Sequence, residues 1–273
     1  MHTDKRHIVE INKQQAEFYD KFHTNEELNL PSRLWRQFRR HIRSTANVTE
    51  QAYEFQQAAF MTAKPRRVLE VGCYEGRDQS MWLIRAPWLE RYVGIELSET
   101  AIRRFRARLA PEDAAKTELI AGDFIVHELP EASFDAVYMH GVFHHFPDPD
   151  PVVERVAQLL VPGGSFITFD PMETNPLFRA VRAVYRPFQS DRDWEWPLRE
   201  AAFGSLKERL ELQKLQGFLG REMYGAVLYT LCPLPPVARF WQHTRQIDVE
   251  RAATIGPGLF RCNSVVMWWQ KPV

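Results

Sequence analysis

The chain has 273 residues, of which 45% are apolar and 26% are charged, an ordinary composition for a globular protein with a sizeable core. Basic and acidic residues number 35 each, so the basic surplus of a general nucleic-acid-binding protein is absent. The three cysteines are scattered and form no C-x-x-C pair, which argues against a zinc or disulfide framework and is typical of a reducing cytoplasm.

The first part of the chain, residues 1–64, is predicted to be helical. Apolar residues recur there at helical spacing: Phe18, Tyr19 and Phe22, then Leu34, Trp35 and Phe38. No pattern typical of a strand interrupts these residues, so we expect helices up to the start of the next segment.

From residue 65 onward, short apolar strands alternate with amphipathic helices. Strands are predicted at 67–72, 92–96, 118–121, 134–139, 165–169 and 264–269. Helices are predicted after the first strand up to about residue 85, from Ser98 to about 109, and over 151–160 and 237–253. Such alternation predicts βαβ units and a parallel sheet that is covered by helices on both faces. Right-handed crossovers then give an α/β, doubly wound fold.

Residues 171–215 break this alternation. They are rich in proline, arginine and aromatic residues, as in Arg186-Pro187-Phe188 and in the run from Trp194 to Pro197. We predict that they form an insertion over the carboxyl ends of the strands. The alternation of elements is expected to resume weakly near residues 223–231.

A turn with two glycines follows the first predicted strand and reads Glu70-Val71-Gly72-Cys73-Tyr74-Glu75-Gly76. Glycines at this place let the backbone approach a ligand closely, at the positive end of the next helix. In a doubly wound sheet, ligands bind beyond the carboxyl ends of the strands. The spacing does not match the G-x-G-x-x-G fingerprint of dinucleotide-binding proteins.

Acidic side chains follow the next two predicted strands. Glu96 can accept hydrogen bonds from both hydroxyls of a ribose, a role that leaves nicotinamide and adenosyl cofactors equally open. Asp123, in Gly122-Asp123, can accept a hydrogen bond from an exocyclic amine such as that of adenine. Phe124 can supply an apolar face for the same ring.

Taken in order, Val68–Gly76, Glu96 and Gly122-Asp123 resemble the class I S-adenosylmethionine (SAM)-dependent methyltransferases. The run His140–Pro149, followed by Leu160–Gly164, is similar to the bacterial group that includes the ubiquinone and menaquinone biosynthesis methyltransferases. The resemblance covers about residues 65–170. It implies a Rossmann-like, doubly wound, mostly parallel seven-stranded sheet. Residues 65–273 would form the SAM-binding domain, 1–64 a helical lid, and 171–215 a cap over the substrate.

The resemblance implies S-adenosyl-L-methionine as the cofactor and assigns roles to individual residues. Glu70, Gly72 and Gly76 would shape the pocket for the amino-acid end, His140 would line its floor, and Tyr19 would belong to the lid. The residues expected to contact the cofactor are Tyr19, Glu70, Gly72, Cys73, Tyr74, Gly76, Glu96, Leu97, Asp123, Phe124 and His140.

One residue departs from the family pattern E-x-G-x-G-x-G, because Tyr74 stands where the middle glycine is expected. One hypothesis is that Tyr74 points away and the cofactor still binds. The other is that its Cβ and phenol crowd the methionine end and weaken or alter the use of the cofactor.

His144 and His145 are the catalytic candidates. Histidine titrates near neutrality, so either could act as a general base, with His144 slightly favoured. A structural or pocket-lining role is the alternative. A metal site with Asp148 and Asp150 is disfavoured, because adjacent residues rarely ligate one metal together and no third ligand is evident.

Four residues are candidates for binding the substrate: Asp170, Arg186, Trp194 and Trp196. Asp170 ends the fifth strand and faces the mouth of the sheet, where it would orient a substrate or cap the following turn. Arginines favour an anionic group and tryptophans a planar or apolar body. The alternative is a packed lid with its arginines in solvent.

The predicted function is methyl transfer from SAM to a small-molecule acceptor, such as the hydroxyl of a natural product, by in-line displacement. The alternatives are a non-catalytic partner subunit with Tyr74 blocking the site, and a methyltransferase acting on a lipid or quinone precursor. The glycine spacing opposes a nicotinamide-dependent oxidoreductase. Zero net charge and the lack of an Asn-Pro-Pro-aromatic signature oppose an RNA methyltransferase. We expect no nucleic-acid partner, no stable membrane insertion and a cytoplasmic location.

Overall fold

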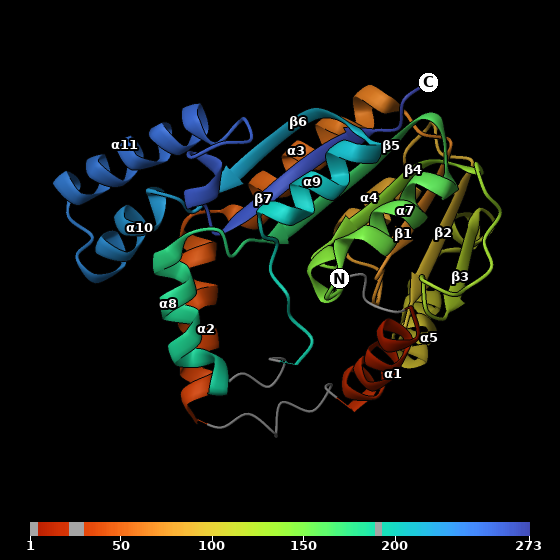
Figure 1. Cartoon of the computed structure of the whole chain (residues 1–273), viewed down its shortest axis with the longest axis horizontal. Helices are drawn as coiled ribbons and strands as arrows, with labels where there is room; N and C mark the ends of the chain where they lie inside the picture. The colour runs from red at the N-terminus through yellow and green to blue at the C-terminus, as the bar shows by residue number, and fades with distance from the viewer. Residues whose placement is uncertain (1–4, 22–29, 189–192) are drawn as a thin grey trace.

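The computed structural model describes residues 5–21, 30–188 and 193–273, and a twisted seven-stranded sheet forms the centre of these residues (Figure 1). The strand order is β3-β2-β1-β4-β5-β7-β6. The strands are β1 (Arg67–Val71), β2 (Arg91–Glu96), β3 (Thr117–Ala121), β4 (Phe134–His140), β5 (Leu160–Pro171), β6 (Glu211–Phe218) and β7 (Ser264–Gln270). Strands β1 to β5 are parallel, whereas β7 runs antiparallel to both β5 and β6. The sheet is therefore mixed and mostly parallel.

Helices cover both faces of the sheet. The α-helices are α1 (Lys5–Lys21), α2 (Leu30–Thr45), α3 (Val48–Ala63), α4 (Asp78–Ile84), α5 (Glu99–Arg108), α6 (Pro111–Ala114), α7 (Pro149–Leu159), α8 (Pro176–Tyr185), α9 (Glu200–Arg209), α10 (Glu222–Leu231) and α11 (Pro235–Arg251). Short 3-10 turns are η2 (Phe143–His145), η3 (Arg186–Phe188) and η4 (Leu259–Arg261). Helices α7 and α9 lie on one face of the sheet and α3 and α4 on the other (Figure 1).

The alternation of side chains along β1 explains this layering. Leu69 and Val71 are buried in the core under α7 and α9, while Val68 is buried in the core under α3, α4 and α5. Helix α5 begins where the sequence indicates, because the Ser98 hydroxyl accepts a hydrogen bond of 3.1 Å from the Ala101 backbone N–H. Such an N-cap stabilises a helix by about 1 kcal/mol.

The sequence expectation fails after β5. The alternation resumes at β6, which begins at Glu211 inside the predicted insertion, and residues 223–231 lie in helix α10. Strand β6 is an edge strand that pairs only with β7, so its first half faces solvent and carries no continuous apolar run. Gly225 lets α10 pack tightly on α11, because a Cβ at this position would lie 2.6 Å from Cα of Trp241.

The topology determines where a ligand can bind. Strand β1 is flanked by β2 on one side and β4 on the other, so the chain reverses its direction of winding between β1 and β4. Parallel sheets bind ligands beyond the carboxyl ends of the strands at such a point. Across the described segments, no helix is both long and apolar enough to cross a membrane.

Candidate active site

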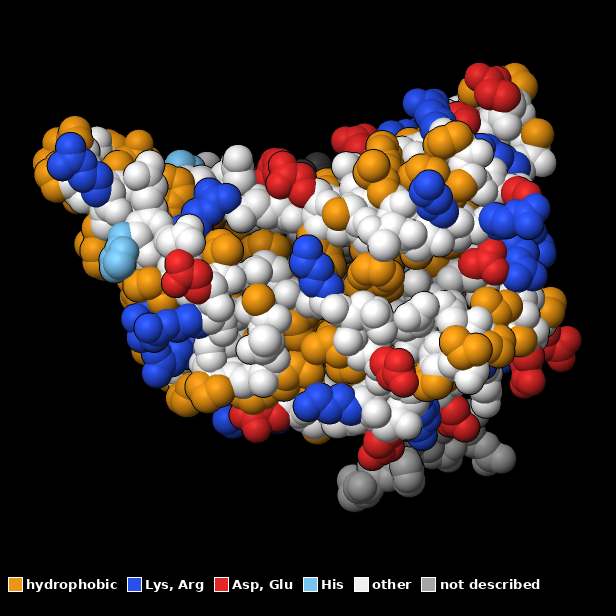
Figure 2. All heavy atoms as spheres, turned by 90° about the horizontal axis from the view of Figure 1, so that it is seen from above, with side chains coloured by type: hydrophobic (Ala, Val, Ile, Leu, Met, Phe, Trp, Pro, Cys, Tyr) orange, Lys and Arg blue, Asp and Glu red, His pale blue; other side chains and the backbone are white. Residues whose placement is uncertain are grey.

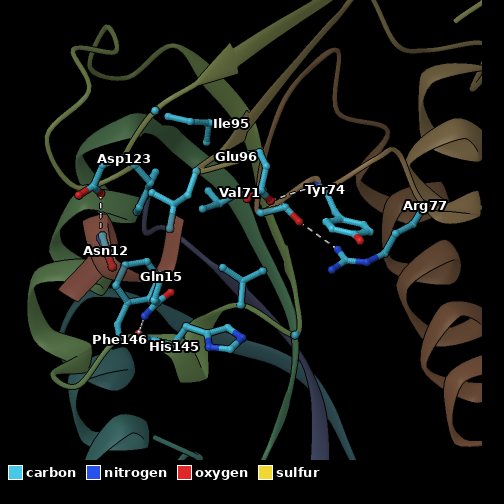
Figure 3. Close-up of a pocket in the computed structure, with 16 residues that line it drawn as sticks. Asn12, Gln15, Val71, Tyr74, Arg77, Ile95, Glu96, Asp123, His145 and Phe146 are labelled. Carbon is cyan, nitrogen blue, oxygen red and sulfur yellow. Dashed lines mark hydrogen bonds between the residues drawn. The ribbon is translucent and has the colours of Figure 1, made fainter. Parts of the chain in front are cut away.

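A pocket lies beyond the carboxyl ends of β1 to β4, at the reversal point (Figure 3). Residues from α1, from the turn after β1, from the ends of β2 and β3 and from the loop after β4 line it. Six of the predicted cofactor residues are among them: Gly72, Tyr74, Glu96, Leu97, Asp123 and Phe124. The pocket thus lies at the edge of the sheet where the sequence predicts a ligand site.

The turn after β1 keeps a left-handed backbone at all three motif positions. The φ angles are 69° at Gly72, 50° at Tyr74 and 74° at Gly76. A Cβ at Gly72 would overlap the Val142 side chain, and one at Gly76 would overlap the Phe105 ring. Tyr74 therefore holds the conformation that a glycine would adopt, at a cost of about 1–2 kcal/mol for a non-glycine residue.

Glu96 is fixed by backbone donors at the edge of the pocket. Its Oε2 accepts a hydrogen bond of 3.1 Å from Tyr74 N–H, and its Oε1 accepts one of 3.1 Å from Ser98 N–H. Burial raises the pKa of Glu96 above its ordinary value. An ionised carboxylate has about four acceptor positions, so lone pairs remain for the two hydroxyls of a ribose.

Asp123 has one satisfied and one unsatisfied oxygen. Oδ1 accepts hydrogen bonds from Ile125 N–H at 2.8 Å and from Asn12 Nδ2 at 3.0 Å (Figure 3). Oδ2 is buried without a hydrogen-bond partner, and burial raises the pKa of Asp123. A buried acceptor left in this state costs about 1–3 kcal/mol. An exocyclic amine in the pocket would supply the missing donor, so the site fits the adenine of SAM.

Three of the predicted cofactor residues, Glu70, Cys73 and Gly76, are not among the residues that line this pocket, and their contact with a cofactor stays a prediction. The alternation of β1 turns Glu70 away from the core under α7 and into the opposite face. There it is fully buried and accepts hydrogen bonds from Tyr92 OH at 2.6 Å and Ser80 Oγ at 2.9 Å. Burial raises the pKa of Glu70 to about 7. Cys73 is also fully buried, and burial raises the pKa of its thiol well above the ordinary value.

His140 is also a correction, because it faces α3 instead of this pocket. Its Nδ1 lies 3.2 Å from Gln56 Oε1, which also accepts a hydrogen bond of 3.0 Å from Tyr138 OH. The rings of Tyr53 and Phe169 each lie 4.9 Å from the imidazole. Burial lowers the pKa of His140 well below its ordinary value, so the ring is neutral near pH 7.

Three polar side chains of the pocket were not predicted: Asn12, Gln15 and Arg77. The Gln15 side chain donates a hydrogen bond of 3.2 Å to the His145 carbonyl, so α1 contacts the site at two separate points. Arg77 Nη1 donates a hydrogen bond of 3.0 Å to the Gly72 carbonyl. A cation directly after the last glycine of the turn was a usable signal for Arg77, whereas nothing in α1 marked Asn12 or Gln15. The side chain of Tyr19, also in α1, lies outside the described residues.

Asp170 is buried beneath His144 and is not available to a substrate, which corrects its predicted role. Its Oδ1 accepts a hydrogen bond of 3.1 Å from the His144 backbone N–H and lies 2.9 Å from Nδ1 of the same residue. Thr168 Oγ1 donates to Oδ2. The carboxylate therefore orients the imidazole and holds a proton on Nδ1, which leaves Nε2 as the basic nitrogen.

His145 differs from its neighbour. It lines the pocket, and its Nδ1 donates a hydrogen bond of 2.7 Å to the Trp194 carbonyl. The two imidazole rings lie 4.1 Å apart. Burial and the adjacent His144 lower the pKa of His145 to about 3. His145 is thus a weak base, and the pair of His144 and Asp170 has the better geometry for accepting a proton.

Two of the predicted substrate residues, Trp194 and Trp196, contact η2 through their backbone. Trp194 accepts the hydrogen bond from His145, and Trp196 N–H donates one of 2.7 Å to the His144 carbonyl. Arg186 and Trp196 line a separate cavity of about 190 Å³ next to α9. The structure thus brings backbone groups of both tryptophans to the histidines and places Arg186 in the same cavity as Trp196. No group of three or more potential metal ligands occurs among the residues that the structure describes.

Three features lie at the reversal point of this sheet, which has one antiparallel strand. They are a left-handed, glycine-type turn after β1, an acidic residue at the end of β2 and a second acidic residue after β3. This combination is similar to the fold and the cofactor site of the class I SAM-dependent methyltransferases. Residues 69–168 match the family described as a methyltransferase domain. This segment of the chain is therefore similar to a SAM-dependent methyltransferase domain.

Curated relatives with assigned reactions are similar to part of the chain. A fatty-acid O-methyltransferase of Mycolicibacterium smegmatis is 31% identical over 152 residues, which are 56% of this chain and 49% of that protein. The 24-methylenesterol C-methyltransferase 2 of Oryza sativa subsp. japonica is 34% identical over 131 residues, which are 47% of this chain and 35% of that protein. The chain thus spans at most half of the length of these relatives.

Solved structures share the fold at low sequence identity. The geranyl diphosphate C-methyltransferase of Streptomyces coelicolor, solved with S-adenosyl-L-homocysteine, superposes with a TM-score of 0.52 at 13% identity and covers 76% of this chain and 69% of its own. The N-methyltransferase NodS of Bradyrhizobium japonicum gives a TM-score of 0.51 at 15% identity and covers 82% and 96%. At these identities the likeness supports the fold alone.

Proposed function

We propose that the chain transfers a methyl group from SAM to a small-molecule acceptor. The observation that carries the proposal is the buried, unpartnered Oδ2 of Asp123 in a pocket whose other acid, Glu96, is preorganised by backbone donors. When bound, SAM supplies an electrophilic methyl group on a sulfonium.

Each of the pocket residues binds a different part of the cofactor in this proposal. Asp123 accepts a hydrogen bond from the adenine amine and Glu96 accepts them from the ribose hydroxyls. Phe124 and Leu97 provide apolar walls for the ring. Arg77, beside the glycine turn, supplies positive charge for the carboxylate of the methionine end.

His144 is the group that we propose to accept a proton from an acceptor hydroxyl, at Nε2. Asp170 holds the other ring nitrogen and stabilises the positive charge that develops on the imidazole. General base catalysis of this kind increases the reaction rate by about 10²–10⁴-fold. An acceptor that is already nucleophilic would depend less on His144.

Helix α1 is proposed to act as a lid. The pocket has a volume of about 130 Å³, less than the roughly 300–1,000 Å³ of small-molecule sites. Asn12 and Gln15 of α1 reach into it and bond to Asp123 and to the loop after β4. Entry of a cofactor as large as SAM therefore requires α1 to move outward. The lid over residues 1–64 and the cap over 171–215 stay predictions.

Apolar molecules are the favoured acceptors. The relatives act, by name, on a fatty acid and a sterol. The similarity of His140–Pro149 to the quinone-biosynthesis group keeps a quinone precursor as the alternative. A natural-product hydroxyl is a further acceptor of this chemical kind.

Calorimetric titration with S-adenosylhomocysteine, with NADH as the control, tests the cofactor assignment. We expect micromolar binding of S-adenosylhomocysteine alone. Asp123→Asn should weaken it about 10–100-fold, because an amide would face the adenine amine in place of the charged acceptor. Glu118→Gln, at an exposed acid of the neighbouring strand β3, is the matched control and should bind normally. Failure of the unmodified chain to bind S-adenosylhomocysteine would refute the proposal.

A further inference from the structure

Helices α10 and α11 form an arm, residues 222–251, that projects to one side of the sheet (Figure 1). The two helices pack closely, because a Cβ at Gly225 would lie 2.6 Å from the hydroxyl oxygen of Thr244. Residues 232–234 join the helices at the end of the arm that lies away from the sheet. We call residues 228–240, which surround this connection, the tip of the arm.

The tip exposes apolar side chains. Leu228, Leu231 and Leu234 are 48%, 75% and 56% exposed, and Phe240 is 45% exposed. Every residue from 231 to 236 is exposed, and three of these residues are prolines. Apolar side chains that gather on one projecting surface are typical of a site that binds a partner.

The charges around the tip are all positive. The sequence from 223 to 247 contains no acidic residue, whereas Arg239 is exposed and Arg245 is half-buried. The acids that bound this run, Glu222 and Asp248, are only 2% and 6% exposed. Glu222 accepts a hydrogen bond of 3.3 Å from Trp241 Nε1, and Asp248 accepts three from backbone N–H groups at the start of α10. Both acids are therefore satisfied inside the arm.

The surroundings of the tip add no negative charge near it. Figure 2 shows hydrophobic and basic side chains together at the projecting end of the arm. Helix α2 packs against α10 through Ile42 and Ala226, has no acidic residue in its sequence and exposes Arg40. Glu250 is exposed, but it lies at the other end of α11, roughly 20 Å from the tip by the rise of the helix. A partner that covers the tip thus meets apolar and basic groups.

We propose that the tip docks on the surface of a lipid bilayer that contains anionic lipids. Leu231, Leu234 and Phe240 enter the boundary between head groups and acyl chains, and Arg239 pairs with lipid phosphates. The end of a helical hairpin is convex, and a convex apolar surface bordered by basic residues suits a bilayer interface. The proposal goes beyond the proposed function and does not depend on it, because no residue of the tip lines the cofactor pocket.

Sedimentation of the full chain with lipid vesicles tests the proposal. We expect vesicles of phosphatidylglycerol and phosphatidylcholine in equal parts to bind the chain at least about tenfold more tightly than vesicles of phosphatidylcholine alone. Salt at about 0.5 M should reduce this difference, because it screens the attraction between the basic residues and the anionic lipids.

Paired variants locate the docking surface. Phe240→Glu should lower the affinity for the mixed vesicles at least about tenfold, because a charge replaces a side chain that enters the bilayer. Val249→Glu is the matched control, since Val249 lies on the same helix and is equally exposed at 45%, but at the base of the arm. Arg239→Gln should lower the affinity about fivefold. Arg251→Gln, at the exposed last residue of α11, should not.

Cys232 allows docking to be observed directly. It is exposed at the tip, whereas Cys73 and Cys262 are buried, so a thiol-reactive dye labels this cysteine selectively. The emission of a polarity-sensitive dye on Cys232 should shift to shorter wavelength when the mixed vesicles are added. The same dye on Met61→Cys, in a chain that also carries Cys232→Ser, should not shift, because Met61 is 57% exposed on α3, outside the arm.

Three results would overturn the proposal. One is equal affinity for the two kinds of vesicle at low salt, and another is an equal loss of vesicle binding in Phe240→Glu and Val249→Glu. The third is a dimer in sedimentation velocity without lipid that Phe240→Glu separates, since the tip would then be an interface between two copies of the chain. Far-ultraviolet circular dichroism shows whether each variant is folded. S-adenosylhomocysteine enters none of these measurements, so failure of the proposed function would leave their outcome standing.

Discussion

The buried carboxyl of Glu70 makes the stability of the protein depend on pH in a predictable direction. Burial raises its pKa from the ordinary 4.5 to about 7 in the folded state. Between these two values the folded protein holds a proton that the unfolded chain releases. The free energy of unfolding therefore falls, through this group, as the pH rises from 4.5 to about 7, and it changes no further above pH 7.

The size of the effect follows from the same two pKa values. Each pH unit of the interval corresponds to about 1.4 kcal/mol, and the interval from 4.5 to 7 spans 2.5 units. The charged form of Glu70 thus lowers the free energy of unfolding by about 3 kcal/mol at pH 7 and above. Glu70→Gln cannot ionise, and the hydroxyls of Tyr92 and Ser80 can rotate to meet the amide. The variant should match the unmodified protein near pH 4.5 and exceed its stability by up to about 3 kcal/mol at about pH 8.

Urea unfolding of both proteins at several pH values between these limits measures the difference directly. Glu118→Gln, at an exposed position on β3, controls for the loss of a surface charge. A difference between Glu70→Gln and the unmodified protein that stays constant with pH would refute the reasoning. So would a difference that grows as the pH falls, because that sign belongs to a carboxyl whose pKa is lowered by folding.

Two further predictions concern the active site. In Tyr74→Gly, relief of the left-handed backbone is offset by about 0.5–1 kcal/mol of added chain entropy. We therefore expect urea unfolding to show a change within about 1 kcal/mol and S-adenosylhomocysteine to bind within about tenfold; complete loss of binding would show that the phenol is essential. In Asp170→Asn, His144 loses its charged partner, so kcat should fall at least about 100-fold. Because Asp170 lies outside the cofactor pocket, the affinity for S-adenosylhomocysteine should stay the same, and an equal loss of both would indicate a purely structural role.

The parallel part of the sheet was predictable because its strands are buried on both faces and read as short apolar runs bounded by turn residues. Strand β6 was not predictable in this way. It is an edge strand with one solvated face, and its polar residues Lys214 and Gln216 interrupt any apolar run. Helix α10 was also missed. Its tight packing on α11 depends on the contact between Gly225 and Trp241, which no local sequence pattern predicts.

In the site, too, residues with a local sequence signal were predictable, whereas contacts between residues far apart in the chain were not. Glu96 and Asp123 both line the pocket because the carboxyl ends of parallel strands meet at one edge, and their contact with the cofactor stays a prediction. The contact between Asn12 and Asp123 joins residues 111 positions apart, and the buried Ile8 and the hydrogen bond from Gln15 to the His145 carbonyl also hold α1 at that edge. His140 shows the opposite error, because it ends a strand as expected but faces α3.

Glu70 shows how a motif residue can serve a ligand site without contacting it. Its carboxylate lies 4.0 Å from Arg77, and Arg77 in turn donates a hydrogen bond to the Gly72 carbonyl. The acid therefore supports, from beneath the sheet edge, the cation and the turn that face the pocket. Because its pKa is about 7, the charge that attracts Arg77 is present only partly near neutral pH. Arg77 thus links Glu70 to the turn that lines the pocket, and the strand alternation at Val68 and Leu69 turns the Glu70 side chain away from that pocket.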